Sequence, residues 1–221
     1  MAVAAQAPWY RSLLQSLERN GHLPYSHYAQ LATVRADMRP ANRTIVFRGF
    51  SDDQELLQFT TDARSRKVEE IKGCPWGELC WYFPETREQF RLFGLLDVIG
   101  EQEEAAERRA WRLDAWTKMS TVSRQQFAGP FPGTPREQGE EDTTSVAGTR
   151  QSEGGESSAA LLTSPSLPLP LPLPNFCLLT LEPQEVDHLQ LKTNRRFVYK
   201  RCGRDGEDEK KQYWEEMEVN P

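Results

Sequence analysis

The sequence has no stretch of apolar residues long enough to cross a membrane. Residues 1–8 lack a charged segment followed by an apolar core, so we expect no secretory signal. Positively charged residues are fewer than negatively charged ones: the chain has 27 lysines and arginines and 33 aspartates and glutamates, which give a formal net charge of −6. That balance argues against a nucleic-acid-binding surface over the whole chain. We therefore expect a soluble, cytoplasmic protein whose basic sites, if any, are local.

Cysteine and histidine are scarce and scattered. The chain has four cysteines and three histidines, and Cys74 and Cys80 have no second pair to complete a zinc signature. We expect reduced, partly buried thiols and no metal site. His188 has no acidic or nucleophilic residue placed with it, so we expect it on the surface. A length of 221 residues allows one domain, with room for an insertion.

The sequence does contain a succession of short runs rich in aromatic, aliphatic and β-branched residues, separated by turn residues. These runs predict about eight strands, at residues 28–35, 43–50, 56–61, 79–83, 89–99, 176–181, 186–192 and 195–201. A turn is expected over 182–184, and the continuous apolar run 79–83 favours burial on both faces. The pattern predicts a mainly β fold, a closed antiparallel barrel with peripheral helices.

Helices are predicted over residues 8–20 and 68–72, with one or two more over 101–119 and a further turn or two over 120–127. Composition changes at residues 130–174, which hold eight of the fifteen prolines. Such a segment buries too little apolar surface to offset its ordering entropy. We predict one domain made of residues 1–129 and 175–221. Residues 130–174 are then a disordered insertion, a linker or, through the repeated Leu-Pro, a docking motif for a proline-binding module.

Three cations, Arg64, Arg66 and Lys67, crowd the start of the short predicted helix. The N-terminus of a helix is already electropositive because of its free N–H groups and the macrodipole. Further cations there are unfavourable unless an anion binds among them, and phosphate is the usual guest. The residues alone leave two interpretations open, a phosphate site or a solvated basic turn.

Several short motifs in a fixed order resemble the pyridoxamine 5′-phosphate oxidase-like flavoproteins, and a less characterised branch of them most closely. The motifs are Arg-Thr-Ile-Val-Phe-Arg (43–48), Phe-Thr-Thr (59–61), Ser-Arg-Lys (65–67), a glutamine after Glu-Thr-Arg-Glu, a late Arg-Arg and a terminal Trp…Asn-Pro. The resemblance covers about residues 9–127 and 176–221. It implies a split β-barrel that forms a homodimer and holds FMN at the subunit interface.

The resemblance also implies which residues bind FMN. Those expected at or beside the phosphate are Ser65, Arg66 and Lys67, and those expected near the flavin are Arg43, Arg48, Phe59, Thr60, Gln89 and Arg196. Arginine and lysine suit a phosphate dianion. Arg43 and Arg48 are five residues apart and face opposite sides of an ideal strand. For both to reach one flavin, the strand needs a bulge or must contact the flavin at its end.

The activity implied by the resemblance is that of an oxidoreductase. Hydride would pass from the amine- or alcohol-bearing carbon of a vitamin B6 phosphate to flavin N5, and oxygen would take the electrons. The sequence identifies no catalytic side chain, consistent with a flavin that carries the chemistry. The substrate is less well supported, because the Arg-x-His motif that grips substrate in true pyridoxamine phosphate oxidases is absent between Leu189 and Arg196, and Leu189 replaces a tryptophan near the flavin.

Two other classes of function remain open. One is a binding protein, a split barrel that holds flavin or another anionic cofactor such as haem for sensing or storage. The other is a proline-rich interaction adaptor, which rests on the insertion alone.

Overall fold

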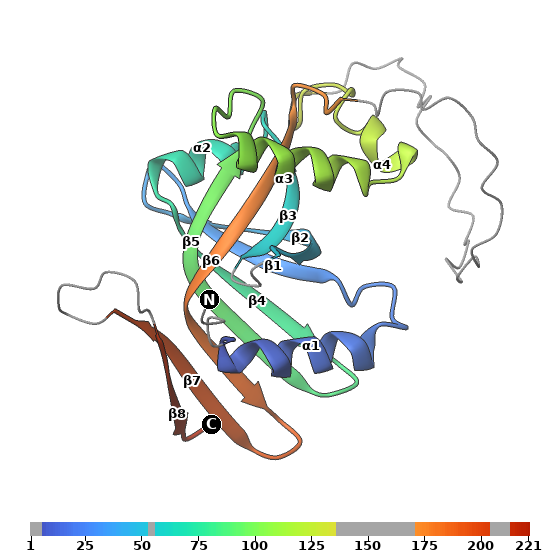
Figure 1. Ribbon diagram of the computed structural model, residues 1–221. Helices are drawn as coiled ribbons and strands as arrows, with labels where there is room; N and C mark the ends of the chain where they lie inside the picture. The colour runs from blue at the N-terminus through green and yellow to red at the C-terminus, as the bar shows by residue number, and fades with distance from the viewer. Residues whose placement is uncertain (1–5, 53–55, 136–170, 204–212) are drawn as a thin grey trace.

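The computed structural model describes residues 6–52, 56–135, 171–203 and 213–221 (Figure 1). These residues form eight strands and four helices. In chain order they are α1 (Pro8–Asn20), β1 (Tyr28–Val34), β2 (Pro40–Phe50), β3 (Leu57–Asp62), α2 (Arg66–Gly73), β4 (Trp76–Phe83), β5 (Glu88–Ile99), α3 (Ala106–Thr117), α4 (Thr121–Gln125), β6 (Phe176–Gln190), β7 (Arg195–Cys202) and β8 (Tyr213–Val219).

Neighbouring strands pair in the order β3-β2-β1-β4-β5-β6-β7-β8, and β3 also pairs with β6. This additional pairing closes β1 to β6 into a six-stranded antiparallel barrel, from which β7 and β8 extend as a hairpin. Figure 1 shows α2 and α3 near one end of the barrel, and α1 with the β7–β8 hairpin toward the other. The predicted mainly β split barrel is confirmed.

Alternate residues of the strands point into the barrel and form its core, in which Phe59 and Trp81 are fully buried. Trp9 of α1 joins the same core. Trp116 and Phe176 belong to a second, smaller cluster at the α3 end. The apolar spacing of the sequence therefore supplies two cores, one inside the barrel and one at its α3 end.

β6 is one continuous strand, so the prediction of two strands separated by a turn was wrong. Pro183 pairs with Gly94 of β5 beside a register shift at Phe93–Gly94, where Gln184 is the extra residue of β6. It also lies where pairing with β3 ends, at Leu181, and before pairing with β7 begins. A proline is tolerated at such a point because its missing N–H breaks no regular ladder. Gly94 is needed there, since an added Cβ would lie 2.1 Å from the carbonyl oxygen of Glu182.

Three further expectations are corrected. Residues 213–219 form β8, for which no strand was predicted. β4 is buried on one face only, with Tyr82 47% exposed on the other. His188 is buried at 1% exposure, with its ring stacked on Phe90 at 4.0 Å and its Nε2 3.8 Å from Glu88 Oε1. An isolated histidine in a sequence carries no sign of such burial, because its neighbours come from other strands.

All four cysteines are free thiols, as expected, and burial raises the pKa of Cys177 to about 11. No helix among the described residues is long and apolar enough to cross a membrane. Most of the predicted insertion, residues 136–170, lies outside the described residues. Its disorder therefore stays a prediction.

Candidate functional site

The first candidate cluster lies where β2 and β3 part. The two strands pair only over Phe47–Phe50 and Leu57–Phe59. Residues 40–46 of β2 pair with β1, and residues 60–62 of β3 pair with β6. α2 follows β3 directly and bridges the two strands, since Lys67 bonds to β3 and Glu70 bonds to β2.

Lys67 is a partly buried cation held by hydroxyl groups. Its Nζ donates to Thr61 Oγ1 at 2.9 Å and to Ser65 Oγ at 3.1 Å. Burial, and then the nearby charge of Arg43, lower the pKa of Lys67 below its ordinary value. None of the described carboxylates forms an ion pair with this ammonium. The site therefore has a positive charge with no directly bonded counter-ion.

Arg43 points inward from β2 and ties that strand to α2. It donates from Nη2 to Glu70 Oε2 at 2.6 Å and from Nη1 to Thr33 Oγ1 at 2.5 Å. Burial acts to raise the pKa of Glu70, but the hydrogen bonds from Thr33 and Arg43 outweigh it and hold that pKa below its ordinary value. The guanidinium is thus oriented before any ligand binds.

The three cations at the start of α2 have different surroundings. Arg64 pairs with Asp62 at 2.7 Å and donates to the carbonyl oxygen of Gly129 at 2.9 Å, so its role is structural. Arg66 is exposed, lines an open groove beside the β1–β2 turn, and bonds to no described residue. Of these three cations, Arg66 and Lys67 therefore remain available to an anion, as far as the described residues show.

Arg48, Phe59 and Thr60 lie farther along the same strands. The β2–β3 register shifts between Phe47 and Gly49, so β2 has a bulge, one of the two features expected if Arg43 and Arg48 reach one flavin, and Arg48 is in it. Arg48 is exposed, whereas Arg43 lies on the inward face. The side chain of Phe59 is fully buried, so Phe59 offers a ligand only its backbone, while Thr60 is partly exposed.

The second candidate cluster lies on β5, β6 and β7. Gln89 pairs with Leu189, and Leu189 pairs with Arg196, so the three side chains share one face of the sheet. Asp187 accepts two hydrogen bonds from Arg196, at 2.9 Å from Nε and 2.6 Å from Nη2. We call the outward side of β4 to β8 the outer face; it carries Trp76, Tyr82, Gln89, Phe93, Asp187, Arg196 and Met217.

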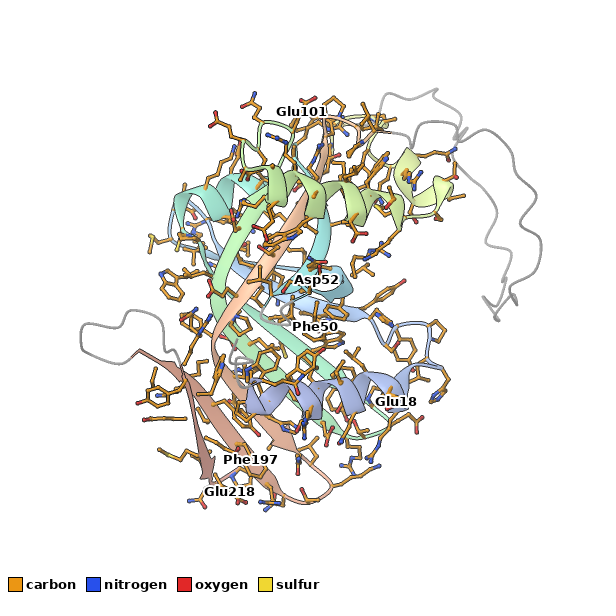
Figure 2. All side chains as sticks on the ribbon, in the orientation of Figure 1. Glu18, Phe50, Asp52, Glu101, Phe197 and Glu218 are labelled. Carbon is orange, nitrogen blue, oxygen red and sulfur yellow. The ribbon has the colours of Figure 1, made fainter. Side chains whose placement is uncertain are left out.

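The two clusters lie far apart in one chain. Thr61, which bonds to Lys67, pairs with Cys177 of β6, whereas Gln89 pairs with Leu189 of the same strand. At about 3.3 Å per residue, these two β6 positions are separated by roughly 40 Å along the strand. Figure 2 shows the corresponding ends of the molecule, with Glu101 at one and Phe197 at the other. The nine predicted residues therefore form two groups rather than one site within a chain.

Comparisons with known proteins identify the family. A family model described as pyridoxamine 5′-phosphate oxidase, FMN-binding domain, matches residues 6–100. The chain is 40% identical over 215 residues to the pyridoxine/pyridoxamine 5′-phosphate oxidase 2 of Arabidopsis thaliana. The alignment covers 97% of this chain and 98% of the relative. This chain belongs to the pyridoxamine 5′-phosphate oxidase-like FMN-binding family.

Solved structures agree with this family assignment. A pyridoxamine 5′-phosphate oxidase-related, FMN-binding protein from Nostoc punctiforme superposes with a TM-score of 0.80 at 40% identity, covering 98% of this chain and 100% of that chain. PhzG from Burkholderia lata, at 19% identity and a TM-score of 0.60 over 97% and 96% of the two chains, shares the fold. FMN as the family's cofactor, predicted from the sequence, is confirmed. The individual contacts remain predictions.

Sequence reasoning missed Asp187 and Glu70, which hold Arg196 and Arg43. Each acidic residue lies nine or more positions from its arginine, on a different strand or helix. No local signal in the sequence could have joined them.

Proposed function

We propose that this protein is a homodimeric FMN-dependent oxidoreductase of the pyridoxamine 5′-phosphate oxidase type. The observation that carries the proposal is the environment of Lys67, a partly buried ammonium whose described hydrogen-bond partners are hydroxyl groups. A buried charge is costly unless it is paired. A phosphate dianion would supply the pairing, with the N–H groups of the first turn of α2 and the free guanidinium of Arg66 as further donors. The residues present therefore fit the phosphate of FMN.

The remaining predicted residues fit the flavin end. Arg48 and Thr60 present polar groups outward from β2 and β3, and Gln89 offers both a donor and an acceptor. Arg196 offers a cation, which favours the anionic reduced form of a flavin. When bound, FMN supplies hydride acceptance from a substrate carbon and reoxidation by oxygen. The protein's part in this proposal is to bind and orient.

The homodimer is proposed from the separation of the two clusters. Lys67 and Gln89 of one chain lie too far apart along the barrel to touch one FMN. A second chain that brings its outer face against the first would add its Gln89 and Arg196 to the site of Lys67. The outer face is suited to burial, because Trp76, Phe93 and Tyr82 are 41%, 42% and 47% exposed there.

The substrate proposed is a small molecule with an amine- or alcohol-bearing carbon. Vitamin B6 phosphates are the first candidates because of the named activity of the Arabidopsis relative. The turn between β6 and β7, where the Arg-x-His motif is missing, is short and closed. Leu191 N donates to Arg87 O at 3.0 Å, and Lys192 Nζ donates to Glu85 O at 2.6 Å. We therefore propose weak binding of the substrate phosphate. A cytoplasmic location also stays part of the proposal.

The first test is an absorbance spectrum of the purified protein. We expect a flavin spectrum that bleaches when a B6 phosphate or another amine or alcohol substrate is added without oxygen. A flavin spectrum that no candidate substrate bleaches would favour the storage or sensing alternative. Colourless protein that takes up no added FMN would refute flavin binding altogether.

The second test concerns the dimer. Phe93→Arg places a charge in the outer face and should yield a monomer with weakened FMN binding, measured by sedimentation and absorbance. Val122→Arg is the matched control, because Val122 is an exposed apolar residue of α4 and not part of the outer face. A monomeric Phe93 variant with a full complement of FMN would contradict the shared site.

A further inference from the structure

We propose that Asp187 is a positioning residue that fixes the guanidinium of Arg196 and moderates its charge toward the flavin. This inference rests on the proposed function. Arg196 and Asp187 form a bidentate salt bridge, a fork in which Nε donates to Oδ1 at 2.9 Å and Nη2 donates to Oδ2 at 2.6 Å. Such a fork fixes the plane of the guanidinium as well as its position. Nη1 of Arg196 keeps no described partner and is left to meet a ligand.

Asp187 is itself held from the opposite side. Arg91 of β5 places Nη1 3.7 Å from Asp187 Oδ2 and donates from Nε to Glu78 of β4 at 2.5 Å. The strand register therefore builds a row of alternating charge across four strands, Glu78, Arg91, Asp187 and Arg196. Asp187 is 9% exposed, so water screens its charge less than that of an exposed carboxylate.

This row of charges determines the orientation and the effective charge of the Arg196 guanidinium toward a ligand. A lone arginine on an exposed strand would sample many rotamers and would carry a full positive charge. With Asp187 bonded to it, the guanidinium is fixed and its field is partly cancelled. A nearby cation stabilises the anionic reduced flavin and so raises its reduction potential. Because Asp187 partly cancels the charge of Arg196, the potential should be lower than it would be beside an unpaired arginine. Asp187 should therefore affect both the affinity for FMN and its midpoint potential.

The chain contains a matched control on the next residue. Arg195 forms the same kind of fork with Glu218 of β8, at 2.8 and 2.9 Å. Adjacent strand residues face opposite sides, so this fork points away from the outer face. Figure 2 labels Glu218 on the hairpin. Glu218→Gln thus removes one carboxylate charge from an arginine fork of β7 without touching the proposed flavin side.

The experiment compares Asp187→Asn, Glu218→Gln and the unaltered full-length protein by FMN titration and by the midpoint potential of the bound flavin. Asp187→Asn should raise the Kd for FMN roughly 3- to 10-fold, less than the loss of a whole charged hydrogen bond. It should also shift the potential to more positive values, and Asp187→Glu should restore it. Glu218→Gln should change neither quantity.

Several results would overturn the inference. Asp187→Asn with unaltered Kd and potential, or with the same shifts as Glu218→Gln, refutes the positioning role while flavin binding stands. An unaltered protein that takes up no FMN refutes the proposed function, and this role with it. If Asp187→Asn does not fold, the same FMN titration can be made on Arg196→Lys, because lysine retains the charge but cannot form the two hydrogen bonds of the fork. Its Kd should rise by a similar factor, and an unchanged Kd would refute the role.

Discussion

Replacement of Lys67 by methionine tests the phosphate site through two quantities that should respond differently. In the apoprotein the ammonium is disfavoured, as its lowered pKa shows, with burial as the main cause. Methionine fills a similar volume without charge. Thr61 Oγ1 and Ser65 Oγ lie 3.2 Å apart, so each can still bond to the other after Lys67 Nζ is removed. The free energy of unfolding of the apoprotein should therefore stay unchanged or increase.

The affinity for FMN, in contrast, should decrease. A hydrogen bond to a charged group contributes about 1.5–3 kcal/mol, so the Kd should rise about 10- to 150-fold. Fluorescence titration with FMN measures the Kd, and thermal unfolding of the apoprotein measures its stability. Lys72→Met, on an exposed position of the same helix, is the control and should change little. An unchanged Kd for the Lys67 variant would show that the start of α2 is a basic turn without a phosphate role.

Three further predictions address pH, the insertion and the substrate. The pKa of Glu70 is lowered in the folded state, so its contribution to stability is present above the unfolded-state pKa and is lost as the pH falls through the folded-state pKa. Glu70→Gln should therefore cost about 1–2 kcal/mol of unfolding free energy at neutral pH, and urea unfolding should show the difference shrinking below about pH 4; a constant difference would contradict this. Limited proteolysis should cut within residues 133–174 and leave a folded, flavin-binding core, and excision of residues 136–170 should leave FMN binding intact; a protease-resistant segment would refute its disorder. Hydrogen peroxide release with each B6 phosphate should show a raised KM, because the missing motif would contribute binding in ground and transition states alike; turnover equal to that of an authentic oxidase would show that the motif is dispensable here.

The strands, the barrel and the basic helix start follow from local signals in the sequence. Runs such as 43–50 and 89–99 alternate or concentrate apolar residues, and the structure places β2 and β5 there. Lys67 was identified because cations at a helix start are conspicuous. These features depend on residues within a few positions of one another.

The features that could not be predicted from the sequence depend on pairing between residues far apart in the chain. The sequence predicts a turn at Pro183 because Gly94, with which it pairs beside the bulge, lies about ninety residues earlier in the chain. His188 is buried by Phe90 and Phe197 of the neighbouring strands. The bond between Arg43 and Glu70 likewise requires α2 to fold back onto β2. Each of these features depends on which strands become neighbours, and composition does not reveal that.

The wide spacing between Lys67 and Arg196 has a genetic consequence. In the proposed dimer, each of the two FMN sites would take Lys67 from one chain and Arg196 from the other. A chain defective at Lys67 and a chain defective at Arg196 would each form inactive dimers alone. Mixed together, they would form one site that carries both defects and one that carries neither. Two loss-of-function alleles of this kind should therefore complement each other in the same cell, whereas two alleles within one cluster should not.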